Sequence, residues 1–160
     1  MRNKKIGIKI FKYFVVVLMI AYTSALLILS GGSNKPFESV SKQVENVVNE
    51  ETMDKADTQL LKRYYGLNAS DYEGVMLYLS KSSVSAEEVL LIKAKSEEQV
   101  DAIQDTIERR RDSRRADFDG YAPEEVKLLD ESVLQIRGKY VFFAASKDVS
   151  KLKKAFTEGL

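Results

Sequence analysis

The sequence predicts an α+β protein with one N-terminal transmembrane helix followed by a single domain. Three observations support this prediction. The chain has an uncharged apolar run near the N-terminus and short apolar runs typical of strands. The segments before and after these runs carry apolar side chains at steps of three and four residues, which is typical of helices. The expected elements of the domain include two strand-strand-helix units in succession. This order predicts a sheet of four mostly antiparallel strands with helices on one face.

The first thirty residues carry five basic side chains and no acidic one, whereas the whole chain has 25 basic and 24 acidic residues. The uncharged run Tyr13–Leu29 is long enough for a bilayer core, which needs roughly 17 to 25 apolar residues. A basic tail before such a run is retained in the cytoplasm. We therefore expect a basic cytoplasmic tail at 1–12, a signal-anchor helix at 13–30 and a linker at 31–36. The alternative is secretion after cleavage near the small residues 30–32.

The extracytoplasmic domain is expected to cover residues 37–160, a length suited to one hydrophobic core. Its first helix follows Pro36 and its second ends before Gly66, because proline suits a helix start and glycine a helix end. The apolar runs 74–79 and 89–94 predict the first two strands. Ser96 and Gln99 then have the spacing of a capping box, which predicts a helix carrying Val100 and Ile103 on its buried face.

The second half of the domain repeats this order. Pro123 predicts the start of a short helix. The runs 133–137 and 140–145 are expected to form a hairpin, because Gly138 and Lys139 between them suit a two-residue turn. Asp148 is a candidate cap for a final helix that reaches the C-terminus.

Several kinds of chemistry are excluded because the chain contains no His, no Cys and no Trp. A Ser-His-Asp or Cys-His nucleophile, a structural zinc site and a thiol redox centre each need a side chain that is missing. We expect no cofactor and no metal. After the first thirty residues the chain has 20 basic and 24 acidic residues, so its net charge there is −4 and nucleic acid is not an expected partner.

Two patterns could carry chemistry but have simpler explanations. Ser39 with Lys42, and Ser150 with Lys153, match the Ser-x-x-Lys spacing of some hydrolases, but the chain lacks the accompanying Lys-Thr-Gly motif. Exposed helix surfaces explain both pairs. A group of acidic residues around a turn could bind a hard cation, or could simply form the turn and start a helix; its members are Asp117, Asp119, Glu124 and Glu125.

The densest basic cluster outside the tail is a run of arginines, whose guanidinium groups suit phosphate and carboxylate oxygens. Acidic residues are interleaved with it, so a solvated helix face is the alternative interpretation. We treat the cluster as a candidate patch for an anionic partner. It consists of Arg109, Arg110, Arg111, Arg114 and Arg115.

Several spaced motifs together resemble the domain-of-unknown-function family number 4358 of Gram-positive bacteria. They are the residues 65–68 and 70–72, the strand 88–95, the turn 118–123 and the hairpin 138–142. The resemblance covers roughly 37–160 and implies a small exported protein. The resemblance also implies that many members carry a lipid on a Cys after the signal. This chain has no Cys, which favours the transmembrane segment as its anchor. The resemblance implies no activity and no site residue.

These observations predict a protein of the cell membrane, single-pass, with the domain outside the cell. Its expected role is a non-enzymatic binding or interaction module of the bacterial cell envelope, whose partner is a protein or an anionic envelope component. One alternative is a carboxylate- or Ser/Lys-dependent envelope hydrolase. Another is a structural subunit of a membrane assembly. The sequence leaves the oligomeric state open.

Overall fold

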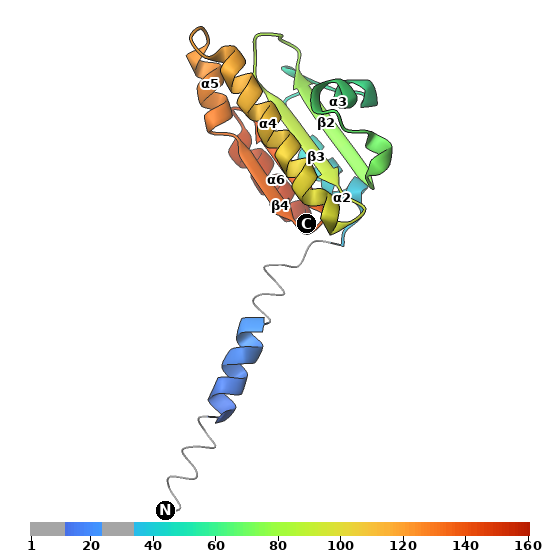
Figure 1. Cartoon of the computed structure of the whole chain (residues 1–160), viewed down its shortest axis with the longest axis vertical. Coiled ribbons are helices and arrows are strands. Elements are labelled where there is room, and N and C mark those ends of the chain that lie inside the picture. Colours follow the sequence, from blue (N-terminus) through green and yellow to red (C-terminus); the bar gives the residue numbers. More distant parts are fainter. Residues whose placement is uncertain (1–11, 24–33) are drawn as a thin grey trace, which may run out of the picture. The chain divides into compact units, whose positions relative to one another are not determined.

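The computed structural model describes residues 12–23 and 34–160 of the chain (Figure 1). Residues 12–23 form a helix whose apolar side chains are exposed, among them Tyr13 and Phe14. Within the two described ranges, no helix combines the length and the apolar character that crossing a membrane requires. Residues 24–30 of the predicted signal-anchor helix lie outside the described residues, as do residues 1–11 of the tail and 31–33 of the linker.

The domain contains a sheet of five antiparallel strands in the order β1-β2-β3-β5-β4. The prediction of four strands was therefore wrong by one. The missed strand has only three residues, two of them charged, and pairs with the edge of β2. The strands are β1 Met53–Lys55, β2 Gly74–Ser80, β3 Glu88–Lys93, β4 Val133–Arg137 and β5 Tyr140–Ala145.

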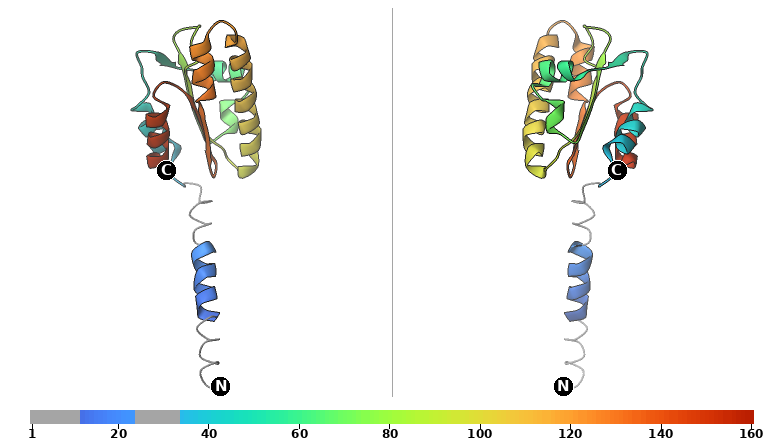
Figure 2. Two further views of the ribbon diagram at one scale, coloured as in Figure 1. Left: turned by 90° about the vertical axis from the view of Figure 1, so that its left-hand side faces the viewer. Right: turned by 90° about the vertical axis from the view of Figure 1, so that its right-hand side faces the viewer.

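Helices cover both faces of this sheet, which corrects the predicted one-sided arrangement (Figure 2). The α-helices of the domain are α2 Phe37–Glu45, α3 Thr58–Tyr65, α4 Val100–Phe118, α5 Pro123–Asp130 and α6 Val149–Gly159. Helices α3, α4 and α5 pack on one face, and α2 and α6 on the other. Two short 3₁₀ turns, Ala69–Asp71 and Glu97–Gln99, complete the domain.

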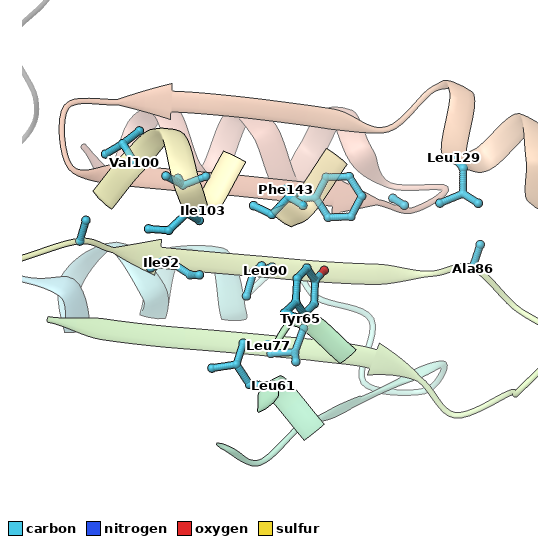
Figure 3. Close-up of a cluster of buried hydrophobic side chains, with 14 of the residues drawn as sticks. Leu61, Tyr65, Leu77, Ala86, Leu90, Ile92, Val100, Ile103, Leu129 and Phe143 are labelled. Atoms are coloured by element: carbon cyan, nitrogen blue, oxygen red, sulfur yellow. The ribbon is translucent and has the colours of Figure 1, made fainter. Parts of the chain in front are cut away.

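The two central strands explain why both faces are covered. Every residue of β5 is buried, and so are the first five of β3. Because neighbouring side chains of a strand point to opposite faces, a fully apolar strand needs a core on each side. Leu90 and Phe143 contribute to the core under α4, as Figure 3 shows, whereas Leu91 and Phe142 contribute to the core under α2 and α6.

Local sequence signals set the ends of several elements as expected. Gly66 follows α3 with a φ of 70°, and Gly138 opens the β4–β5 turn with a φ of 54°. The side-chain oxygen of Gln99 accepts a hydrogen bond from the backbone N–H of Ser96 at 3.4 Å, as a capping box requires. Asp148 does occupy the cap position of α6, but its carboxylate accepts a hydrogen bond from the Lys151 side chain at 2.6 Å instead of from a backbone N–H of the first turn.

Candidate functional site

A pocket of about 340 Å³ lies where β2 ends and β3 begins. The Ser-rich loop 81–87 joins these two strands and forms one wall, and α4 forms another. The lining of the pocket includes Tyr64, Ser82, Ser83, Ser85, Glu87, Glu88, Arg110, Arg114 and Asp117. Pockets of this size hold small ligands or one group of a larger partner.

Helix α3 has well-defined ends and brings Tyr64 to the pocket. The carboxylate of Asp57 accepts a hydrogen bond from the N–H of Leu60 at 2.8 Å, which fixes the first turn. Gly66 ends the helix in a left-handed conformation. The last two residues before it therefore diverge: Tyr65 is buried in the core, and Tyr64 remains 40% exposed at the pocket rim.

Tyr65, Glu88 and Arg110 form a buried polar network beside the pocket. The Arg110 guanidinium binds Glu88 through two parallel contacts, Nε to Oε1 at 2.8 Å and Nη2 to Oε2 at 2.8 Å. The hydroxyl of Tyr65 donates to Oε1 of the same carboxylate. The Arg110 guanidinium also lies over the ring of Tyr64, 4.7 Å from its centre. This network joins α3, α4 and β3 at one end of the sheet.

Burial and charge perturb two groups of this network. Burial, followed by the nearby carboxylate of Glu88, raises the pKa of Tyr65 well above its usual value, so the phenol keeps its proton. Burial alone would lower the pKa of Arg110, but the hydrogen bond and charge of Glu88 outweigh it and raise that pKa. Arg110 therefore stays charged, and Glu88 already compensates its charge.

Arg114 lies one turn after Arg110 and faces the same pocket, but its contacts differ. Its Nη2 donates to the carbonyl of Ser85 at 2.9 Å, and its guanidinium lies 4.5 Å from the centre of the Phe118 ring. Its Nε is buried and has no hydrogen-bond partner within the described ranges. Among the described residues, no carboxylate lies within ion-pair distance of Arg114. An unpaired buried donor costs about 1–3 kcal/mol, so a small turn of the Arg114 side chain that presents Nε to a ligand oxygen in the pocket would be stabilising.

The five arginines of the predicted patch do not all line the pocket. Arg110 and Arg114 face the pocket, whereas Arg115 pairs with Asp130 at 2.6 Å and Arg111 with Asp112 at 3.0 Å. Arg109 is exposed, and its Nη2 donates a hydrogen bond to the hydroxyl of Thr106 in its own helix. Helix periodicity explains this division, because residues four apart share a face and adjacent residues do not.

The other sequence candidates lie elsewhere. Ser39 and Lys42 are exposed on α2, and Ser150 and Lys153 on α6, with no hydrogen bond between the members of either described pair. In the acidic group, Glu125 accepts the N–H of Ala86 at 2.6 Å and so holds the Ser-rich loop. The described part of the chain contains no set of three or more acidic side chains placed to hold a metal ion.

The pairing of Glu88 with Arg110 was missed, although the sequence carries a signal for it. Glu88 is an acidic residue directly before an apolar strand run, and Arg110 continues the buried stripe formed by Ile103 and Ile107 on α4. An acid and a base that both extend apolar faces are expected to meet, because buried charges are paired.

The pocket lies entirely within a segment that matches a known family profile. The match covers residues 45–146, and the family is described as a domain of unknown function, DUF4358. The chain belongs to the DUF4358 family. The DUF4358 match includes all five strands and helices α3, α4 and α5, but only the last residue of α2 and none of α6. No curated protein and no solved structure matches the chain.

Proposed function

We propose that this DUF4358 protein is a non-enzymatic, membrane-anchored binding module that holds an anionic group of a cell-envelope partner at Arg114. The observation that carries the proposal is the buried Nε of Arg114, which has no hydrogen-bond partner in the described part of the chain. A phosphate or carboxylate oxygen fits this donor because guanidinium groups bind such oxygens strongly.

The surroundings of Arg114 support an anionic ligand of limited size. Glu88 neutralises Arg110, which leaves Arg114 as the guanidinium at the pocket without a carboxylate partner among the described residues. Ser82, Ser83 and Ser85 line the same pocket and carry hydroxyl groups that are suited to further ligand oxygens. Asp117 and Glu87 also line the pocket, so a single anionic group at Arg114 fits better than a polyanion that would approach these carboxylates.

The binding test uses two anionic probes and a matched pair of variants. Glycerol 3-phosphate and propionate are titrated into the full chain in detergent, and binding is followed by saturation transfer to the probe in NMR spectra. Arg114→Gln is expected to weaken binding of the accepted probe at least tenfold, whereas Arg115→Gln leaves it unchanged, because Arg115 binds Asp130 outside the pocket. Phosphate and carboxylate classes are distinguished by which probe binds. Equal binding to both variants would refute the role of Arg114.

The proposed location follows from the sequence of the N-terminal segment. We propose that residues 13–30 anchor the protein with the basic tail 1–12 in the cytoplasm and the domain outside. The test is fractionation of cells that express the chain, followed by protease treatment of intact cells. The protein is expected in the membrane fraction, and its domain is expected to be digested from outside. A domain that survives this treatment, but is digested after the cells are broken, would contradict the orientation.

A further inference from the structure

The two edges of the sheet differ in how well they are protected against pairing with another strand. The edge strand β1 has three residues, and two of them, Asp54 and Lys55, are exposed and charged. Short length and charge are common ways in which proteins block an edge. The opposite edge strand, β4, has five residues, no proline and a charged residue only at its end, Arg137. By these criteria β4 is an open edge.

The hairpin geometry defines which backbone groups of β4 face outward. Arg137 and Tyr140 flank the two-residue turn, so in an antiparallel hairpin they exchange hydrogen bonds, and every second residue does the same. The N–H and C=O groups of Leu134 and Ile136 therefore point away from β5. Within the described ranges, the single bond that reaches them from outside the strand ladder comes from the Arg137 side chain to the Ile136 carbonyl, at 3.2 Å.

The side chain of Gln135, the middle residue of β4, has an oxygen without a hydrogen-bond donor among the described residues. This oxygen, Oε1, is buried. A buried acceptor without a donor is uncommon in folded proteins and costs free energy. If the Gln135 side chain turns toward the sheet edge, a second amide group placed opposite it would supply the missing donor, because an amide group both donates and accepts.

The strand is complementary to itself when two copies run antiparallel. With Gln135 opposite Gln135, Leu134 of one copy faces Ile136 of the other, and these are the residues whose backbone groups point outward. The central Gln135 pair is then of the type without backbone bonds, in which side chains approach most closely. The same arrangement brings the acidic Glu131 before β4 near the basic Arg137 at its end.

We infer that two copies of this chain associate through β4, antiparallel and centred on Gln135, so that their sheets join into one continuous sheet. The interaction goes beyond the proposed binding of an anionic group, and it uses the edge of the sheet rather than the pocket. Backbone hydrogen bonds of Leu134 and Ile136 supply the pairing, and the two Gln135 amides fix its register.

The absence of cysteine from the chain allows a direct test, because one introduced cysteine is the only thiol. In the proposed dimer the Cα atoms at position 135 lie about 4.5–5.5 Å apart, which suits a disulfide. The matched control is Arg137→Cys, on the same strand and face, because those two cysteines would lie roughly 13 Å apart. Full-length Gln135→Cys and Arg137→Cys are treated in intact cells with diamide, an oxidant that crosses membranes, so the result does not depend on the protein's location.

Gln135→Cys is expected to form a dimer on non-reducing gels that a reductant reverses, at a yield at least fivefold above Arg137→Cys. Equal yields, or no dimer from Gln135→Cys although its thiol reacts with a maleimide, would overturn the inference.

A charge exchange at the same position tests the register independently. Two copies with different affinity tags are co-expressed, and co-purification is measured. Gln135→Lys with itself and Gln135→Glu with itself are expected to lose co-purification, because like charges would face each other. The mixed pair, Gln135→Lys with Gln135→Glu, is expected to recover it, and wild-type copies co-purify. Failure of the mixed pair to exceed the like-charged pairs would count against pairing at Gln135.

Discussion

Removing the charge of Glu88 is expected to destabilise the domain strongly. Glu88 is 6% exposed and Arg110 is 13% exposed in their side chains, so both charges of this ion pair are largely withdrawn from water. The variant Glu88→Gln keeps the size of the side chain but leaves the Arg110 guanidinium without a carboxylate. It also places an amide N–H₂ group against a donor, because the Arg110 guanidinium has only N–H groups to offer.

The expected magnitude follows from this burial. Breaking a buried ion pair by removing one partner costs about 3–5 kcal/mol, whereas replacing both partners by apolar residues is often neutral. We expect Glu88→Gln to lower the free energy of unfolding by about 3 kcal/mol, the lower end of this range, because the ion pair lies beside an open pocket. For a domain of this size the midpoint of thermal unfolding should fall by roughly 10 °C. The double variant Glu88→Leu with Arg110→Met is expected to lose clearly less than Glu88→Gln alone.

Urea unfolding and thermal unfolding followed by circular dichroism measure both variants. The matched control is Asp130→Asn, which breaks the ion pair between Asp130 on α5 and Arg115 on α4. Arg115 lies on the same helix as Arg110, and its Nε lies 2.6 Å from the Asp130 carboxylate. Both side chains of this ion pair are about half exposed, so solvent screens the pair and the variant is expected to match the wild type within error. The reasoning would be refuted if Glu88→Gln were as mild as Asp130→Asn, or if the apolar double variant were the least stable of the three.

Three further predictions concern the packing and the backbone of the domain away from the pocket. At Gly74 a Cβ atom would collide with the ring of Phe37, so Gly74→Ala should cost about 1–3 kcal/mol in urea unfolding, and adding Phe37→Ala should cost less than the two single effects combined. Gly66→Ala should cost about 1 kcal/mol in the same assay because the φ of 70° disfavours any side chain; an unchanged midpoint would contradict this. Burial raises the pKa of Tyr140 from its usual 10 to about 12, so its contribution to stability is complete below pH 10 and is lost as the pH rises towards 12. Tyr140→Phe should therefore lose stability less steeply than the wild type over that range, and parallel curves would count against the shift.

Local signals in the sequence predicted the elements more reliably than the assembly. The β4–β5 hairpin follows from Gly138 and Lys139, and the start of α5 follows from Pro123, because both depend on residues next to each other in the chain. Strand β1 escaped prediction because Met53 is its one buried residue, and a single apolar position has no period. The second helical layer was missed because the burial of both faces of β3 and β5 depends on contacts between distant segments.

The candidate site was predictable in position but not in composition. The arginine cluster on α4 was identified from its charge, yet only Arg110 and Arg114 point to the pocket. Whether an arginine binds a ligand depends on which carboxylates lie nearby. Glu88 comes from a strand 22 positions earlier, so no local pattern shows that it compensates Arg110 and leaves Arg114 unpaired.

The most direct test of anion binding observes the Nε–H proton of Arg114 itself. In ¹H–¹⁵N NMR spectra of the full chain in detergent, this signal is assigned by its loss in Arg114→Gln. Because Nε has no partner among the described residues, its proton should move downfield and saturate as the bound probe, glycerol 3-phosphate or propionate, is added. The Nε–H signal of Arg110, already bonded to Glu88 at 2.8 Å, should stay in place. An Arg114 signal that remains unmoved at saturating concentrations of both probes would contradict the proposed function.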